Sequence, residues 1–190
     1  MRTPQLEVWT GGFGTEYTDR AVVDTQARKE TFRALLEGLP VRTVLEVGCA
    51  KGDNLGALGE LGYVASGVEP MAYASIQAQI QGYRVYQADC FDLPFPPHEF
   101  DLVFTAGVLM HVVPDDITLA LKELWRVTRE YLLVIEYYSL NEMSIEYRGH
   151  EGLLWKRDYS NLDGKLLKTG LLGRGSGFDN CTYWLFQRGE

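Results

Sequence analysis

The sequence is poor in the residues that build metal and disulfide sites. Its three cysteines (Cys49, Cys90 and Cys181) and its three histidines are scattered over 190 residues. None of them shows the short, repeated spacing of a zinc site, so we expect no metal ion. A small, odd set of isolated cysteines is typical of a reducing compartment, and we expect a cytoplasmic protein.

The chain also lacks an excess of positive charge and a long apolar run. It has 18 Lys and Arg against 26 Asp and Glu, a formal net charge of −8. Because phosphate polyanions select basic surfaces, this balance argues against a nucleic-acid partner. No apolar run approaches the roughly 18 residues that a membrane-spanning helix needs, and the first residues lack the apolar core of a signal peptide.

What the sequence does have is an alternation of apolar segments with helical patterns. This alternation predicts an α/β fold, a Rossmann-like, doubly wound, mostly parallel sheet of seven strands, in a single domain over residues 1–190. The expected strands are 43–47, 63–68, 83–87, 100–105, 131–136 and 181–187, and the expected helices between them are 53–61, 71–81 and 115–128.

The two ends of the chain show weaker patterns. We expect residues 1–14 to be irregular and residues 15–38 to form one helix, so that residues 1–38 make a helical lid. Residues 137–157 show no clear period and are expected to be an insertion on the substrate side. We expect a helix over 158–169, and the glycines of 170–178 make that segment a poor strand.

Small and acidic residues follow the first expected strand. Glu46, Gly48, Ala50 and Gly52 are spaced two apart, and Glu69 and Asp89 close the next two strands. Ligands of an open parallel sheet bind beyond the carboxyl ends of its strands. A carboxylate such as Glu69 can accept both hydroxyls of a ribose, Asp89 can accept an adenine amino group, and Cys90 or Phe91 can pack near the ring. The pattern predicts an adenosine-containing cofactor.

Two kinds of cofactor fit such a pattern, and Glu46 distinguishes between them. A nicotinamide dinucleotide would place its pyrophosphate at this glycine loop, where an anionic side chain is unfavourable. The same side chain suits the ammonium group of a methionine moiety, so we interpret the cofactor as S-adenosylmethionine. A dinucleotide site and a glycine turn that binds nothing remain alternatives.

The stretch Val44–Gly52 resembles motif I of the class I S-adenosylmethionine-dependent methyltransferases. Ala50 replaces the middle glycine of that motif and is expected to exclude a positive φ there at little cost. Phe100–Gly107 is similar to motif IV, which lies over the methionine part of the cofactor. The resemblance implies further cofactor contacts from Pro70, Ala106 and Gly107.

Other segments resemble a narrower clade, the methylases associated with pseudaminic acid biosynthesis. This resemblance implies methyl transfer to oxygen or nitrogen of a sugar or nucleotide sugar of the nonulosonic acid type, in carbohydrate biosynthesis. A methyltransferase for another small carboxylate or amine, and a cofactor-binding protein without catalysis, remain alternatives. The segments are Trp9–Arg20, Thr105–His111, Glu136–Tyr138, Tyr147–His150 and Trp155–Asp158.

Three residues are candidate general bases for the acceptor: His111, Glu136 and His150. An alcohol acceptor gains from a base, whereas a neutral amine needs less help. His111 follows the fourth strand on the cofactor side, where it can also be a hydrogen-bonded wall residue. Glu136 ends the fifth strand, where it can also cap a helix or form an ion pair. His150 is placed by the resemblance alone.

The remaining candidates concern the acceptor and the lid. The guanidinium groups of Arg148 and Arg157, with Lys156, suit capture of a carboxylate or phosphate, although they can also neutralise nearby acidic residues. We expect Trp9, Phe13 and Tyr17 to cover the cleft and Arg20 to pair with the methionine carboxylate. Tyr147 joins the substrate side, and one of Tyr137 and Tyr138 should face the site.

Overall fold

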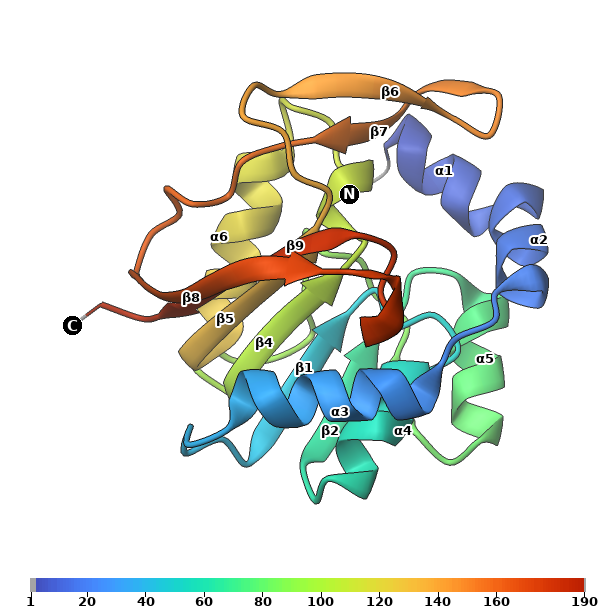
Figure 1. Cartoon of the computed structure of the whole chain (residues 1–190). Coiled ribbons are helices and arrows are strands. Elements are labelled where there is room, and N and C mark those ends of the chain that lie inside the picture. Colours follow the sequence, from blue (N-terminus) through green and yellow to red (C-terminus); the bar gives the residue numbers. More distant parts are fainter. Residues whose placement is uncertain (1–2, 190) are drawn as a thin grey trace.

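A seven-stranded sheet forms the centre of the computed structural model, which describes residues 3–189 (Figure 1). Its strand order is β3-β2-β1-β4-β5-β9-β8, in which β1 to β5 are parallel and β9 is antiparallel to both of its neighbours. This confirms the predicted fold class. The strands are β1 Thr43–Val47, β2 Val64–Val68, β3 Arg84–Tyr86, β4 Phe100–Ala106, β5 Thr128–Glu136, β8 Lys165–Leu172 and β9 Cys181–Gln187.

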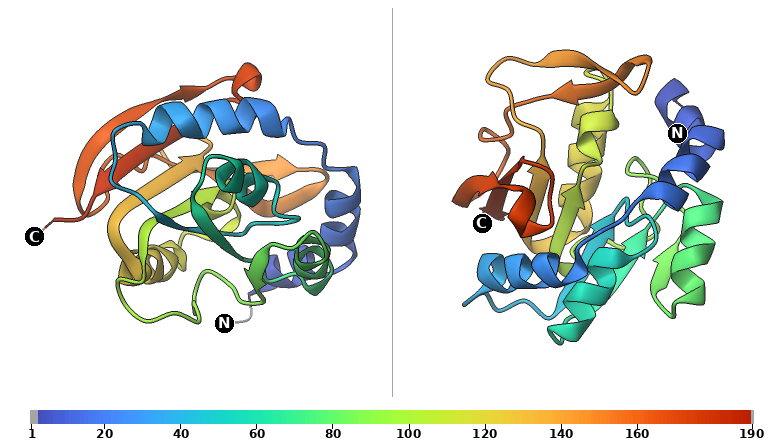
Figure 2. Two further views of the ribbon diagram at one scale, coloured as in Figure 1. Left: turned by 90° about the horizontal axis from the view of Figure 1, so that it is seen from below. Right: turned by 45° about the vertical axis from the view of Figure 1, so that its right-hand side comes forward.

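Helices cover both faces of this sheet because the strands are apolar on both sides. On one face, Phe32, Leu35 and Leu36 of α3 pack with Leu58 of α4 against alternate strand residues. On the other face, Ala120, Leu124 and Val127 of α6 pack against the residues between them. Figure 2 shows α5 and the C-terminal strands at opposite ends of the sheet. The helices are α3 Thr25–Leu36, α4 Asp53–Glu60, α5 Ala72–Ile80 and α6 Ile117–Val127.

The strand register aligns the carboxyl ends of the central strands. Val47 at the end of β1 pairs with Val68 of β2 on one side and with Thr105 of β4 on the other. The loops that follow these strands therefore open at one edge of the sheet. This is the edge at which the sequence predicted a ligand.

Two peripheral units stand at this edge, and both differ from their predicted form (Figure 1). Residues predicted to be irregular form helix α1 Pro4–Thr10 and the first turn of α2 Gly12–Arg20, because Thr3 caps α1 and Pro4 begins it. The rest of α2 lies where a helix was expected. The single helix expected over 15–38 is interrupted before Asp24, whose side chain accepts the Ala27 N–H and starts α3.

The segment after β5 is a β-hairpin. Strand β6 Met143–Tyr147 pairs with β7 His150–Lys156, and the left-handed residues Arg148 and Gly149 form the turn. The helix expected over 158–169 is wrong: residues Lys165–Leu172 form β8, which gains its hydrogen bonds from β9. Pairing with β9 here outweighs the weak helical pattern of the leucines.

No helix within residues 3–189 is both long enough and apolar enough to span a lipid bilayer.

We predict that Leu133→Ala in β5 lowers the free energy of unfolding by about 2–5 kcal/mol, because it opens a cavity in the core. Leu133 is 0% exposed, whereas Leu119 on α6 is 49% exposed. Leu119→Ala is therefore the matched control, and we expect it to change stability little. Urea unfolding of the two variants measures the difference, and equal losses would contradict the described core.

Candidate functional site

A cavity of about 200 Å³ opens at the carboxyl edge of the sheet. Residues from four strand ends line it, together with α1 and α2 from the N-terminal part of the chain. Of the predicted cofactor residues, it brings together those at the ends of β1, β2, β3 and β4. They are Glu46, Gly48, Ala50, Glu69, Pro70, Asp89, Cys90, Phe91, Ala106 and Gly107, with Trp9 and Tyr17 from the helices.

The loop after β1 turns sharply through left-handed backbone at Gly48, Ala50 and Gly52. A Cβ atom on Gly48 would lie 2.4 Å from a methyl carbon of Val108, so only glycine fits there. The expectation that Ala50 excludes a positive φ is wrong, since its φ is 46°. The Ala50 N–H donates to Glu69 Oε2 at 2.9 Å, and this bond holds alanine in the left-handed region.

Glu46 lies beneath this loop and is 2% exposed. Its Oε1 accepts from the Asn54 side-chain amide, and its Oε2 is buried without a partner among the described residues. Burial raises the pKa of this carboxyl to about 8, against the opposing hydrogen bond from Asn54. A buried acceptor oxygen that lines a cavity fits a positively charged donor from a ligand.

Glu69 lines the next part of the cavity, and its two oxygens bind the loops on either side. Oε2 accepts the Ala50 N–H, and Oε1 accepts the Met71 N–H at 2.9 Å. Burial raises the pKa of Glu69, while these two backbone bonds oppose the shift. Each oxygen keeps a further lone pair, so the carboxylate can still accept a pair of hydroxyls.

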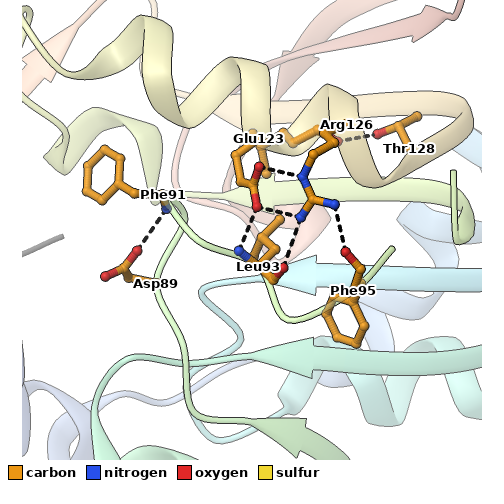
Figure 3. A network of polar contacts seen from close by, with 8 residues as sticks. Asp89, Phe91, Leu93, Phe95, Glu123, Arg126 and Thr128 are labelled. Carbon is orange, nitrogen blue, oxygen red and sulfur yellow. Dashed lines mark hydrogen bonds and ion pairs between the residues drawn. The ribbon is translucent and has the colours of Figure 1, made fainter. Parts of the chain in front are cut away.

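Asp89 and Phe91 stand at the cavity on a loop that α6 holds in place. Asp89 Oδ1 accepts the Phe91 N–H at 2.8 Å. Further along the loop, the Arg126 guanidinium donates to the carbonyls of Leu93 and Phe95, and Glu123 accepts the Leu93 N–H (Figure 3). Arg126 and Glu123 also pair with each other. The Pro-rich connection is therefore a fixed wall rather than a loose linker.

Arg28 is a cavity residue that the sequence did not reveal. It lines the cavity from α3, donates to Asn54 Oδ1 at 2.7 Å and to the Gly177 carbonyl at 3.0 Å, and lies over the Phe178 ring. Arg20, the predicted partner of the methionine carboxylate, is outside the lining and lies over the rings of Phe13 and Tyr17. Arg28 is the better placed guanidinium.

His111 lies on the cavity wall, on the short 3-10 helix η1 Leu109–His111 that follows β4. Its Nδ1 is 2.6 Å from the Leu153 carbonyl oxygen. Because a carbonyl only accepts, Nδ1 carries the proton and Nε2 has the lone pair. Burial lowers the pKa of His111 to about 4, so the ring is neutral at pH 7.

Glu136 and Arg157 take the structural alternatives that the sequence left open, a helix cap and an ion pair with an acidic residue. Glu136 is 0% exposed, and its oxygens accept the N–H groups of Val108, Leu109 and Met110. It is enclosed by the protein and is not positioned to act as a base. Arg157 is also buried, where it pairs with Glu142 and donates to two carbonyls. It is not positioned to capture an anion.

An aromatic cluster next to His111 connects the N-terminal helices to the hairpin. Its rings are Trp9, Phe13, Tyr17 and Tyr147. The Trp9 ring lies 4.5 Å from the His111 ring, 5.1 Å from Phe13 and 5.2 Å from Tyr17. Phe13 meets Tyr147 and His150 of the hairpin. Arg148, at the hairpin turn, lies over the Tyr147 ring.

The other predicted acceptor residues lie apart from this cluster. The Tyr137 hydroxyl binds Asp179, the Lys156 amine lies over the Tyr137 ring, and Tyr138 packs near Trp184. Among the residues that the structure describes, the cavity lining does not include Tyr137, Tyr138 or Lys156.

Comparison with known proteins identifies the chemistry of this cavity. The model of a family described as "methyltransferase domain" matches residues 45–132, which contain the end of β1, all of β2, β3 and β4, and most of the loops around the cavity. This stretch, a little under half of the chain, is therefore similar to a methyltransferase domain. The enzyme uses S-adenosylmethionine as its methyl donor. No curated protein matches the sequence.

Solved structures of similar fold include several methyltransferases. One is the 1,6-didemethyltoxoflavin-N1-methyltransferase of Burkholderia thailandensis with bound S-adenosylhomocysteine, with a TM-score of 0.76, 16% identity, and coverage of 100% of this chain and 92% of that one. Another is the magnesium protoporphyrin IX methyltransferase of Synechocystis with bound S-adenosylmethionine, with a TM-score of 0.71, 13% identity and 99% coverage of both chains.

A third is the sugar N-methyltransferase KedS8 of Streptoalloteichus, with a TM-score of 0.57, 23% identity, and coverage of 86% of this chain and 61% of that one. At these identities the likeness shows the shared fold of the methyltransferase.

The residues at the cavity fit S-adenosylmethionine. The buried, unpartnered oxygen of Glu46 suits the ammonium of the methionine part, and the carboxylate of Glu69 suits the ribose hydroxyls. The guanidinium of Arg28 suits the methionine carboxylate. An acidic and a basic group at the cavity would thus match the two charges at that end of the cofactor.

We predict that cofactor binding releases a proton from Glu46. At pH 7 its carboxyl is mostly protonated, since burial raises its pKa to about 8, and the incoming ammonium favours the ionised form. Isothermal titration with S-adenosylhomocysteine in buffers of different ionisation enthalpy should show release of close to one proton. Glu46→Gln should release none, and a wild-type protein that releases none would contradict this assignment.

Proposed function

We propose that this methyltransferase transfers the methyl group to oxygen or nitrogen of a small anionic metabolite, a sugar or nucleotide sugar. The observation that carries this proposal is the position of His111: a neutral imidazole on the cavity wall, with its lone pair on Nε2 and an aromatic cluster above it. Such a ring can accept a proton or a hydrogen bond from a hydroxyl or an amine.

In the proposed mechanism, the chain holds the cofactor, orients the acceptor and keeps water out. Glu46, Glu69, Asp89 and Arg28 would hold S-adenosylmethionine, which supplies an electrophilic methyl group when bound. His111 Nε2 would accept the acceptor's hydrogen and so direct its lone pair towards the cavity. Alignment of this kind supplies a large part of the rate enhancement in displacement reactions.

The lid and the hairpin would close the acceptor side. The Gln5 side-chain amide donates to the Gly152 carbonyl at 3.2 Å, so α1 touches β7 directly. The rings of Trp9, Phe13 and Tyr147 fill the space between these elements. Residues 137–157 would then act as a substrate-side insertion, and water would be excluded when the rings close.

The anionic character of the acceptor is inferred from the arginines near the aromatic cluster. Arg20 lies over Phe13 and Tyr17, and Arg148 lies over Tyr147, in a chain whose formal net charge is −8. A guanidinium can bind a carboxylate or a phosphate through two hydrogen bonds. The similarity to pseudaminic acid methylases and the name of the sugar N-methyltransferase support a sugar acid or nucleotide sugar. A noncatalytic cofactor-binding protein would lack turnover on every such acceptor.

Arg148→Ala should raise the KM for the acceptor by about tenfold or more, the loss expected for one charge-assisted contact, and leave the affinity for S-adenosylhomocysteine unchanged. The acceptor is found first by incubating the enzyme with S-adenosylmethionine and sugar acids or nucleotide sugars, and measuring a single added methyl by mass. Arg33→Ala, on the exposed side of α3, is the control. Equal effects of the two substitutions would contradict anion capture by Arg148.

His111→Ala should lower kcat by about 100-fold or more for a hydroxyl acceptor, because the group that accepts its proton is lost. The affinity for S-adenosylhomocysteine should change little, since Glu46, Glu69 and Asp89 remain in place. Single-turnover rates and isothermal titration separate the two effects. An unchanged kcat with any acceptor would exclude His111 from the reaction.

A further inference from the structure

We infer that Glu136 and Arg157 are positioning residues that hold the two ends of η1 and thereby fix the His111 ring. This inference rests on the proposed role of His111. It assigns a task to two buried charges that neither the cofactor nor the acceptor would touch.

The turn that carries His111 has little internal support. It is a 3-10 helix of three residues, Leu109–His111, with internal hydrogen bonds from the His111 N–H to the Val108 carbonyl and from the Val112 N–H to the Leu109 carbonyl. Its N–H groups at one end and its carbonyls at the other need partners from elsewhere. The orientation of the His111 ring therefore depends on whatever binds these ends.

Glu136 binds the N-terminal end. Its Oε1 accepts the N–H groups of Val108 and Leu109, each at 3.0 Å, and its Oε2 accepts that of Met110 at 3.1 Å. A carboxylate that faces successive amide groups at the start of a helical turn gains from charge and dipole together. Burial raises the pKa of Glu136, and these three bonds oppose the shift. Glu136 is the last residue of β5, so this end of the turn is bound to the central sheet.

Arg157 binds the other end. One terminal nitrogen donates to the Leu109 carbonyl at 2.9 Å, and the other donates to the Val112 carbonyl at 2.7 Å. Its Nε pairs with Glu142, just before the hairpin. Arg157 follows directly after β7, so this end of the turn is bound to the hairpin.

A third contact links the hairpin to the ring itself. The Leu153 carbonyl, which accepts from His111 Nδ1, belongs to the same strand β7. The hairpin thus supplies both the acceptor that selects the tautomer of His111 and the guanidinium that holds its turn. A change in the position of β7 would move the ring, and this couples the hairpin to the reacting end of the cavity.

Stability alone does not account for these two charges. Burying a carboxylate and a guanidinium carries a large desolvation cost, and apolar residues of similar volume often stabilise a fold at least as well. The two charged side chains instead fix the orientation of the turn, because they hold three of its backbone N–H groups and two carbonyl groups in place. The His111 ring needs a fixed orientation if it is to present one nitrogen to an acceptor.

The test is the protonation pattern of the His111 ring. In the wild-type protein with bound S-adenosylhomocysteine, ¹⁵N spectra of the imidazole should show a single neutral tautomer with the proton on Nδ1. Glu136→Gln and Arg157→Met should give a mixture of tautomers or a ring that titrates closer to its ordinary range. Their kcat should fall by about tenfold or more, while the affinity for S-adenosylhomocysteine stays within about twofold.

Glu142→Gln tests the same contact without touching a buried charge. Its side chain is 41% exposed, so the variant should fold, and it should loosen Arg157 and alter the His111 spectrum in the same direction but less. Arg129→Lys, in a pair with Asp101 at the opposite end of the strands, is the control and should change neither readout.

An unchanged His111 spectrum in folded Glu136→Gln, Arg157→Met and Glu142→Gln would overturn the inference. A loss of kcat accompanied by an equal loss of cofactor affinity would also overturn it, since that indicates general destabilisation. The spectrum does not depend on any acceptor. Failure of the proposed function would therefore appear as absence of turnover in the wild-type protein, with the spectral result still decisive.

Discussion

Three buried glutamates at the carboxyl ends of β1, β2 and β5 determine the shape of the site. Each uses its oxygens to bind N–H groups: Glu46 binds the Asn54 side chain, Glu69 binds the two loops beside it, and Glu136 binds the turn before His111. Parallel strands bring these side chains to one edge because their ends are level. Without them the glycine loop, the second loop and the turn that carries His111 would each lose their anchor.

The three glutamates have different roles because their oxygens differ in how many further hydrogen bonds they can accept. Glu136 is enclosed, with three amides on its two oxygens, and acts on the protein alone. Glu46 has an oxygen without a partner within residues 3–189, and Glu69 lines the cavity, so both can still bind a ligand. A strand-end carboxylate therefore serves the cofactor or the fold according to how many N–H groups already reach it.

Much of this arrangement could be predicted from the sequence, because it depends on local patterns. The alternation of strands and helices gave the sheet, and small residues after an acidic strand end gave the cofactor loop. Arg28 was missed because it reaches the cavity from α3, outside every motif, and only the fold brings it there. The sequence left the role of Glu136 open between a base and a helix cap, because a strand-end glutamate looks the same in sequence whether it meets a ligand or three amides.

In the segments towards the two ends of the chain, prediction from the sequence also failed. Thr3 and Pro4 are a signal for a helix start that could have revealed α1, since the Thr3 hydroxyl accepts the Leu6 N–H. Strand β8 had no such signal, because its conformation is set by pairing with β9. The hairpin likewise depends on cross-strand contacts and on the left-handed turn at Arg148 and Gly149. Periodicity within a segment cannot report partners that lie elsewhere in the chain.

The central claim is that the acidic strand ends form a site for S-adenosylmethionine. The most direct measurement is isothermal titration of the wild-type protein and of Glu69→Ala with S-adenosylhomocysteine, with NAD as the control ligand. We predict that the wild-type protein binds S-adenosylhomocysteine and not NAD, and that Glu69→Ala binds S-adenosylhomocysteine at least tenfold more weakly, as the loss of hydrogen bonds to a charged group implies. Equal affinity in the two proteins, or binding of NAD alone, would contradict it.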